Sequence, residues 1–138
     1  MVELKKFSKS YKSSPKESDF AVQNVNMTCK KGEITGLLGL NGAGKTTILK
    51  AICARHFATG GDVLVEGENP SENLEKVRNL TGFVEEEPAL PGEYTVTEYL
   101  KMVANLHLSA SVCVYPRLTE TLALEELLPK KIKTLSKG

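Results

Sequence analysis

Residues 39–47 carry the strongest chemical signal in this chain. They read Gly-Leu-Asn-Gly-Ala-Gly-Lys-Thr-Thr and match the pattern G-x-x-x-x-G-K-[ST] of loops that wrap a polyphosphate. Backbone N–H groups can surround an anion only where side chains are few, and the three glycines of this stretch meet that condition. Lys45 adds a full positive charge, and the Thr46 hydroxyl is a hard oxygen ligand suited to Mg²⁺. The stretch therefore predicts a phosphate-binding loop.

Two elements must position this loop. Ile34, Leu37 and Leu38 form a compact apolar run before it, as expected of a strand buried on both faces. Residues 46–57 carry apolar side chains at helical spacing, so a helix is predicted to begin in the loop. The N-terminus of such a helix directs unpaired N–H groups and about half a positive charge at a bound anion. A strand followed by a loop and a helix is the context that a phosphate loop requires.

The remaining pattern predicts an α/β first part and an all-helical last part. The apolar alternation slips between Val22 and Val25, which a bulge in a half-buried strand would explain. The further predicted elements are strands near residues 2–7, 20–27, 63–65 and 81–84, a helix capped by Ser71, a helix beyond Thr97 and a helix over 120–128.

Composition excludes several classes of protein. The chain has 138 residues, of which 41% are hydrophobic, enough for a modest globular core. A net charge of +1 and 6% aromatic residues provide neither the basic field nor the stacking surface of a nucleic-acid-binding protein. No apolar run approaches the ~20 residues of a membrane helix. The three cysteines lack metal-ligand spacing and are interpreted as reduced thiols of a cytosolic protein.

Four further features, taken with the loop, resemble the ATP-binding domain of ABC transporters over almost the whole chain. Tyr11 stands where that family places an aromatic residue that stacks on adenine. Residues 60–67 resemble the family's small-Gly-acid, strand, Gly segment, and residues 82–88 resemble its glutamine-loop region. Residues 135–138, Leu-Ser-Lys-Gly, resemble the opening of the signature motif, usually Leu-Ser-Gly-Gly-Gln. The order and spacing of these features carry the resemblance.

The resemblance implies an α/β P-loop NTPase fold of the ABC ATPase type, incomplete, with an antiparallel β segment and a helical subdomain. Residues 1–96 would form the α/β nucleotide-binding core, and residues 97–138 the helical subdomain ending at the signature motif. The implied ligands are ATP and Mg²⁺. The predicted nucleotide-contacting residues are Tyr11, Asn41, Gly42, Ala43, Gly44, Lys45, Thr46, Thr47, Ser136 and Gly138.

One position departs from the family pattern. The family's glutamine, which helps position Mg²⁺ and water and senses the membrane partner, falls at Glu86. A carboxylate still offers a hard oxygen, so Thr46 and Glu86 are the predicted metal ligands, and Lys45 and Glu86 the predicted catalytic residues. Acidic versions occur in the exporter-type branch of the family, which favours an exporter subunit. The alternative is that residues 85–87 form a solvated acidic loop.

The resemblance also implies partners. In a head-to-tail dimer, Ser136 and Gly138 of one subunit would reach the γ-phosphate held by the other. A membrane permease is the second implied partner and would hold the protein at the cytoplasmic, inner face of the membrane; no nucleic acid partner is expected. His56 and His107 fit structural or surface roles.

The function implied for the full-length protein is ATP hydrolysis that powers transport. The family's Walker B carboxylate and a later histidine follow the signature motif, so the 138-residue piece is expected to be inactive alone. Two of its strands would lack sheet neighbours, which predicts poor stability or completion by another copy. Three alternatives stay open: an ATP-binding piece without turnover, a soluble ABC protein acting in repair or translation, and a small-molecule kinase.

Overall fold

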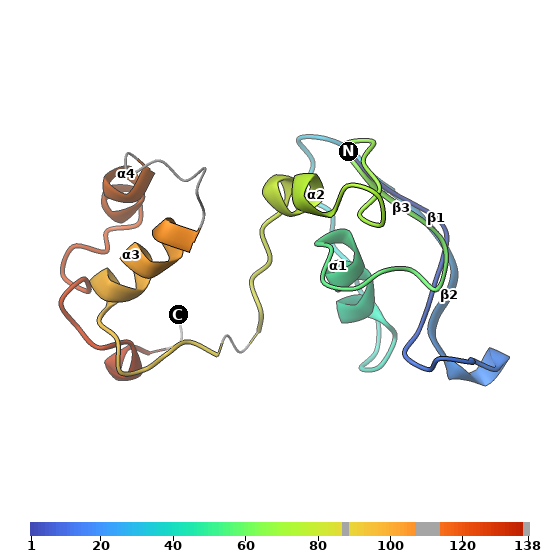
Figure 1. Ribbon diagram of the computed structural model, residues 1–138, viewed down its shortest axis with the longest axis horizontal. Helices are drawn as coiled ribbons and strands as arrows, with labels where there is room; N and C mark the ends of the chain where they lie inside the picture. Colours follow the sequence, from blue (N-terminus) through green and yellow to red (C-terminus); the bar gives the residue numbers. More distant parts are fainter. Residues whose placement is uncertain (87–88, 107–113, 137–138) are drawn as a thin grey trace. The chain divides into compact units, whose positions relative to one another are not determined.

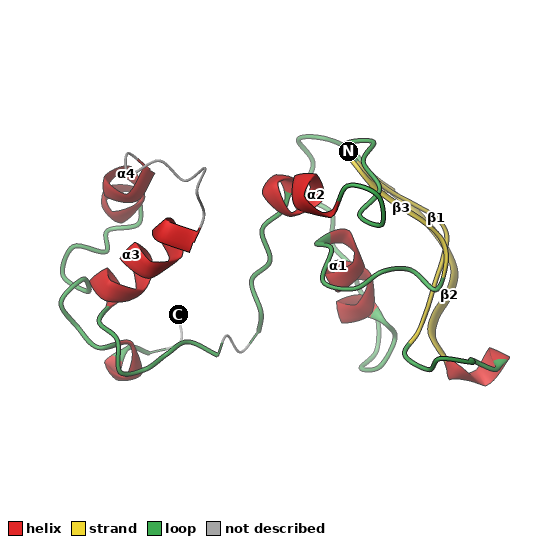
Figure 2. Cartoon of the chain, viewed as in Figure 1, coloured by secondary structure: helices red, strands yellow, loops and turns green. Residues whose placement is uncertain are grey.

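The computed structural model describes residues 1–86, 89–106 and 114–136 of the chain. The chain divides into two compact units, Met1–Val84 and Glu85–Gly138 (Figure 1). Strands are found in the first unit, and the described part of the second unit is built from helices and turns (Figure 2). None of the helices described is long and apolar enough to cross a membrane.

The sheet of the first unit consists of β1 (Val2–Ser10), β2 (Phe20–Cys29) and β3 (Gly60–Val65). Their order is β2-β1-β3, and both pairings are antiparallel. The predicted strands near residues 2–7, 20–27 and 63–65 are confirmed, each within somewhat longer bounds.

The bulge predicted in the second strand is also confirmed. Phe7 pairs with Val25 and Lys9 pairs with Val22, so β2 has one more residue than β1 between these two pairs. The inserted backbone passes through Asn24, whose φ is 53°. The Asn24 N–H, which the ladder cannot satisfy, donates to the Ser8 hydroxyl at 2.9 Å. The Asn24 amide therefore has a partner, and the bulge avoids the free-energy cost of an unpaired amide.

Two helices complete the first unit, α1 (Lys45–Ile52) and α2 (Leu74–Leu80). Apolar side chains from both helices and all three strands form one core, because each element has an apolar face that must be removed from water. Phe7 and Val77 have no exposed surface. The buried apolar residues are Leu4, Phe7, Val22, Ile48, Ala51, Ala54, Val63, Val65 and Val77.

Two predicted strands are wrong. Residues 34–38 and 81–84 form no ladder in the described structure, and neither segment is a strand. The burial on both faces expected of residues 34–38 is wrong as well: Ile34 is 104% exposed and Leu38 94%. A strand needs a hydrogen-bonded neighbour, and β1, β2 and β3 pair only with one another.

Two predicted helix bounds are corrected by local backbone chemistry. The helix predicted over 46–57 ends at Ile52, because the chain turns into a left-handed conformation at Ala54, with φ of 52°. Ser71 does not cap α2, because the helix begins only at Leu74 and Ser71 lies in the preceding turn, where its N–H donates to the Asn69 side chain at 2.9 Å. The N-cap position belongs to Asn73 instead.

The described helices of the second unit are α3 (Val96–Leu106) and α4 (Val114–Thr121), with a 3₁₀ turn at Ile132–Thr134. α3 begins with a capping box, in which the Glu98 carboxylate accepts from the Thr95 N–H at 2.8 Å and the Thr95 hydroxyl accepts from the Glu98 N–H at 3.2 Å. The helix predicted over 120–128 is wrong: α4 ends where that helix was expected to begin, and Ala123 has a φ of 49°.

Candidate functional site

The loop before α1 is shaped by its contact with the sheet. Gly44 is the N-cap of α1 and has a φ of 84°, in the left-handed region that favours glycine. A Cβ at this position would lie 2.3 Å from Val22 Cγ2 and 2.9 Å from the Ala21 carbonyl oxygen, both on β2. Only glycine lets the loop rest against β2, so this contact sets the position of the helix start.

A tight turn forms the centre of the loop. The Ala43 N–H donates to the Leu40 carbonyl at 3.1 Å, and Gly42 within this turn has a φ of 83°. Asn41 and Gly42 are exposed. The turn keeps the backbone on the surface with few side chains over it, which is the arrangement that admits an anion.

The first turn of α1 supplies free amide donors. The first intrahelical hydrogen bond runs from the Ile48 N–H to the Gly44 carbonyl, at 2.9 Å. The amides of Lys45, Thr46 and Thr47 precede it, so α1 has no carbonyl to offer them. Their N–H groups and the helix dipole therefore favour an anion at this end of the helix.

Lys45 folds back over the loop. Its ammonium donates to the carbonyls of Gly39 and Leu40, at 2.7 Å each. These two contacts hold the Lys45 ammonium beside the loop backbone. The ammonium can exchange these carbonyl partners for phosphate oxygens. At ~4 Å and an effective dielectric near 20, one such charge attracts another by about 4 kcal/mol before desolvation.

The loop offers one exposed hydroxyl of the kind that suits a metal ion. Thr46 is exposed at the start of α1, whereas Thr47 is buried with 8% exposure. In the part of the chain that the structure describes, no three His, Cys, Asp or Glu side chains are grouped as metal ligands. A single oxygen ligand fits Mg²⁺, which keeps several waters and takes further oxygens from substrate phosphates. The loop therefore fits a magnesium nucleotide better than a protein-caged metal.

Tyr11 lies next to the phosphate loop. Its hydroxyl is 3.2 Å from Thr47 Oγ1 and 3.4 Å from His56 Nε2. The Tyr11 and His56 rings are perpendicular, with centroids 5.7 Å apart, and the Lys9 ammonium stands 5.3 Å from the Tyr11 ring centroid. Tyr11 is nevertheless 65% exposed. Its ring is thus anchored at the hydroxyl and open to an incoming flat group.

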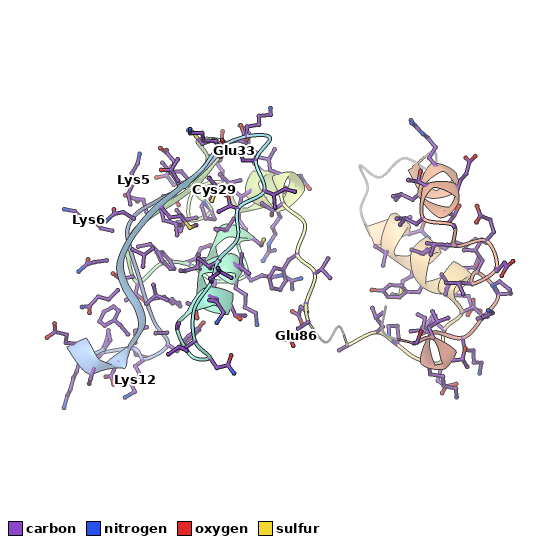
Figure 3. The ribbon with its side chains drawn as sticks, turned by 180° about the vertical axis from the view of Figure 1, so that it is seen from behind. Lys5, Lys6, Lys12, Cys29, Glu33 and Glu86 are labelled. Atoms are coloured by element: carbon purple, nitrogen blue, oxygen red, sulfur yellow. The ribbon has the colours of Figure 1, made fainter. Side chains whose placement is uncertain are left out.

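The other predicted residues belong to the second unit. Glu86 is exposed and lies on the segment that follows the first unit, as Figure 3 shows. Ser136 is exposed just after the 3₁₀ turn. Gly138 lies outside the described residues. Main-chain hydrogen bonds hold the segment before Ser136: the Ile132 N–H donates to the Tyr94 carbonyl at 2.9 Å.

His56 is a member of this site that the sequence did not indicate. It lies nine positions after Thr47, a spacing that does not place two residues on one helix face. The chain brings it back because α1 ends at Ile52 and Ala54 reverses the backbone. Burial lowers the pKa of His56, and the nearby Lys9 charge lowers it further.

The glycine loop, the helix that begins in it and the lysine folded over it define a P-loop nucleotide-binding fold. Comparison with known proteins identifies the family within this fold. The family model described as ABC transporter matches residues 22–138. The chain belongs to the ABC transporter family.

Curated relatives are much longer than this chain. It is 38% identical over 128 residues to the ABC-type organic anion transporter ABCA8B of Mus musculus, covering 91% of this chain and 8% of that protein. It is 38% identical over 124 residues to the phospholipid-transporting ATPase ABCA3 of Homo sapiens, covering 86% and 7%. The chain thus spans a small part of the length of these relatives.

Solved structures of ABC ATP-binding subunits share the fold. One ATP-binding subunit of an ABC transporter superposes with a TM-score of 0.81 at 28% identity, covering 99% of this chain and 56% of that chain. A dimeric, post-hydrolysis state of the ATP-binding cassette MJ0796, bound to ADP and Pi, gives 0.76 at 26% identity and covers 99% and 63%. The predicted fold, an incomplete P-loop NTPase of the ABC ATPase type, is confirmed.

Proposed function

We propose that this chain binds ATP with Mg²⁺ at the loop before α1, and that the full-length protein hydrolyses ATP to power transport. The observation that carries the proposal is the lysine ammonium held over a glycine loop at a helix N-terminus. The solved cassette bound to ADP and Pi, which has the same fold, supports it.

Each loop residue has a role in holding the triphosphate. The backbone around Asn41, Gly42 and Ala43 and the amides at the start of α1 surround the phosphates, and Lys45 exchanges its carbonyl partners for β- and γ-phosphate oxygens. The Thr46 hydroxyl ligates Mg²⁺, which when bound neutralises charge on the phosphates. Tyr11 receives the adenine on its exposed ring.

The proposal also assigns roles to three residues of the second unit. Glu86 is the second metal ligand, and its carboxylate in place of the family's glutamine favours an exporter-type protein. Ser136 and Gly138 contact the γ-phosphate held by another subunit in a head-to-tail dimer. A cassette of the same fold is described as dimeric, which supports this arrangement.

The membrane role rests on the family. ABC family membership and relatives described as an organic anion transporter and a phospholipid-transporting ATPase support coupling to a membrane domain. The protein would then act at the inner face of a membrane, through a permease. The rival proposal is a soluble ABC protein without a permease. In a transporter, the stretch over residues 88–98 is expected to contact the membrane domain. Capture of a membrane domain that is lost when this stretch is replaced would therefore separate the two.

A titration with fluorescent Mg·ATP tests the binding site on protein shown to be folded by circular dichroism. We expect saturable binding in the wild type and its loss in Lys45→Ala. The matched control is Lys30→Ala, which removes an exposed lysine after β2 and should bind as the wild type does. Binding that survives Lys45→Ala would refute the site.

An ATPase assay separates the enzyme from a binding module. Turnover that disappears in Lys45→Ala would support hydrolysis by the protein tested. Binding without turnover would favour an ATP-binding module.

A further inference from the structure

The turn after α1 brings a histidine to the edge of the proposed nucleotide site. α1 ends at Ile52, the Arg55 N–H donates to the Lys50 carbonyl at 2.8 Å, and the left-handed Ala54 reverses the chain. His56 therefore lies beside Thr47, near the beginning of the same helix, rather than continuing away from it. No role in phosphate binding requires a side chain at this position.

Tyr11 bridges this histidine and the phosphate loop. Its hydroxyl lies between Thr47 Oγ1, at 3.2 Å, and His56 Nε2, at 3.4 Å. A Tyr hydroxyl can donate one hydrogen bond and accept another, so it can bond to both neighbours at once. The perpendicular His56 ring, 5.7 Å away between centroids, gives the packing geometry that aromatic pairs prefer. Together these contacts restrict rotation of the Tyr11 ring.

The Tyr11 hydroxyl links the His56 ring to the phosphate loop in either direction of proton donation. His56 Nε2 and Tyr11 Oη lie 3.4 Å apart, and the histidine tautomer decides which of them donates. Between Tyr11 Oη and Thr47 Oγ1, at 3.2 Å, either hydroxyl can be the donor. The three side chains are therefore connected for either tautomer.

We propose that His56 is a positioning residue that holds Tyr11 in place to receive a purine base and ties this platform to Thr47. The inference deepens the proposed function and rests on it. The Lys9 ammonium lies over the Tyr11 ring, and with 65% of Tyr11 exposed a base has room to stack. Loss of His56 frees the ring to rotate, so the base loses its platform while the phosphates keep theirs.

The test compares ATP with inorganic tripolyphosphate, which has no base. On the full chain, His56→Ala is expected to weaken Mg·ATP binding about threefold to tenfold, the range that aromatic pair energies imply, and to leave tripolyphosphate binding unchanged. His56→Gln is the conservative variant, because its amide N–H can still donate to Tyr11 Oη. It should recover most of the lost ATP affinity.

The hydrogen bond itself is tested by a double-mutant cycle. Tyr11→Phe keeps the ring and removes the hydroxyl, and His56→Phe keeps a perpendicular ring and removes Nε2. If His56 acts through its hydrogen bond to the Tyr11 hydroxyl, the double variant loses no more ATP affinity than Tyr11→Phe alone, which already removes the bonds to both His56 and Thr47. Additive losses would overturn the proposed link between them.

Two outcomes overturn the inference and are distinct from failure of the proposed function. Equal weakening of ATP and tripolyphosphate by His56→Ala would mean a general structural role. Unchanged ATP binding in folded His56→Ala would mean no role, and His56→Gln decides the matter where His56→Ala does not fold. Binding lost in Lys45→Ala but unaffected by these variants keeps the nucleotide site and removes the role of His56; no binding by the wild type removes both.

Discussion

The two units of the chain are stabilised in different ways. In the first, apolar side chains form a core in which Phe7 and Val77 are fully buried. In the described part of the second unit, no apolar side chain is buried to that extent. The chain is ordered there by main-chain hydrogen bonds, a capping box and the ion pairs of Glu93 with Lys131 and Lys133. Exposed ion pairs add little, because water and salt screen them.

This difference also distinguishes the two segments that are proposed to contact nucleotide, the phosphate loop in the first unit and the segment of Ser136 in the second. The phosphate loop rests on the core through the contact between Gly44 and β2, so its shape exists before a ligand binds. The segment that carries Ser136 rests on local hydrogen bonds that water can replace. We expect the first unit to provide affinity by itself and the second to need further contacts.

The largest expected effect is the loss of stability when a buried side chain is removed from the core of the first unit. Phe7→Ala removes a fully buried ring, and such substitutions cost about 3–5 kcal/mol in the free energy of unfolding. The control is Leu118→Ala on α4, where the side chain is 50% exposed and a change within about 0.5 kcal/mol is expected. Urea unfolding followed by circular dichroism measures both. Equal losses would show that the units do not differ as described.

A smaller effect should follow from adding one methyl group to the loop. Gly44→Ala forces a non-glycine residue to a φ of 84° and a Cβ to within 2.3 Å of Val22 Cγ2, at a cost of at least about 1–3 kcal/mol. ATP binding should weaken about tenfold or more, which corresponds to ~1.4 kcal/mol. Gly36→Ala is the control, since a Cβ there meets nothing within 4 Å. Unchanged ATP affinity in Gly44→Ala would contradict the role of the sheet in shaping the loop.

A third effect belongs to the second unit. Thr95→Ala removes the hydroxyl of the capping box at the start of α3, and the loss of such a cap costs about 1 kcal/mol. Hydrogen exchange at residues 96–99 should accelerate, while exchange in β1 stays unchanged because the core of the first unit is not touched. Thr121→Ala, at the end of α4, should leave α3 protected. Faster exchange in both units would mean that they unfold together.

The smallest effect is a dependence of stability on pH. The pKa of His56 is lowered by burial, then by the charge of Lys9 and to a smaller extent by that of Lys50, while backbone hydrogen bonds of His56 and Thr47 oppose the shift. Because the unfolded chain then binds the proton more tightly, the free energy of unfolding falls as pH drops below the ordinary histidine value of 6.5.

Carboxylates respond in a lower pH window, which separates the two contributions. Hydrogen bonds from lysine lower the pKa of Glu68 in the first unit and of Glu93 in the second, so their contribution is lost only as pH falls below 4.5. His56→Phe should therefore flatten the pH dependence of unfolding in the window that begins at 6.5 and leave the window below 4.5 unchanged. Urea unfolding at several pH values measures this, and an unchanged upper window would exclude His56 as its source.

The predicted parts of the fold are those with strong local chemistry. The glycine loop, the helix after it and the bulge near Val22 follow from residue types whose backbone preferences act over a few positions. The strands predicted at 34–38 and 81–84 failed for the opposite reason, since an apolar run such as Ile34 to Leu38 becomes a strand only beside a hydrogen-bonded neighbour. The helix over 120–128 failed because Ala123 turns the chain where the apolar spacing was favourable.

The amino-acid sequence by itself determined the phosphate loop, because amide donors, a helix start and Lys45 lie within nine consecutive residues. Only the tertiary structure decided that Gly44 rests on Val22 and that His56 meets Tyr11 across 45 positions. Contacts between distant residues depend on where strands pair and where helices end, and no short stretch of sequence encodes those distances.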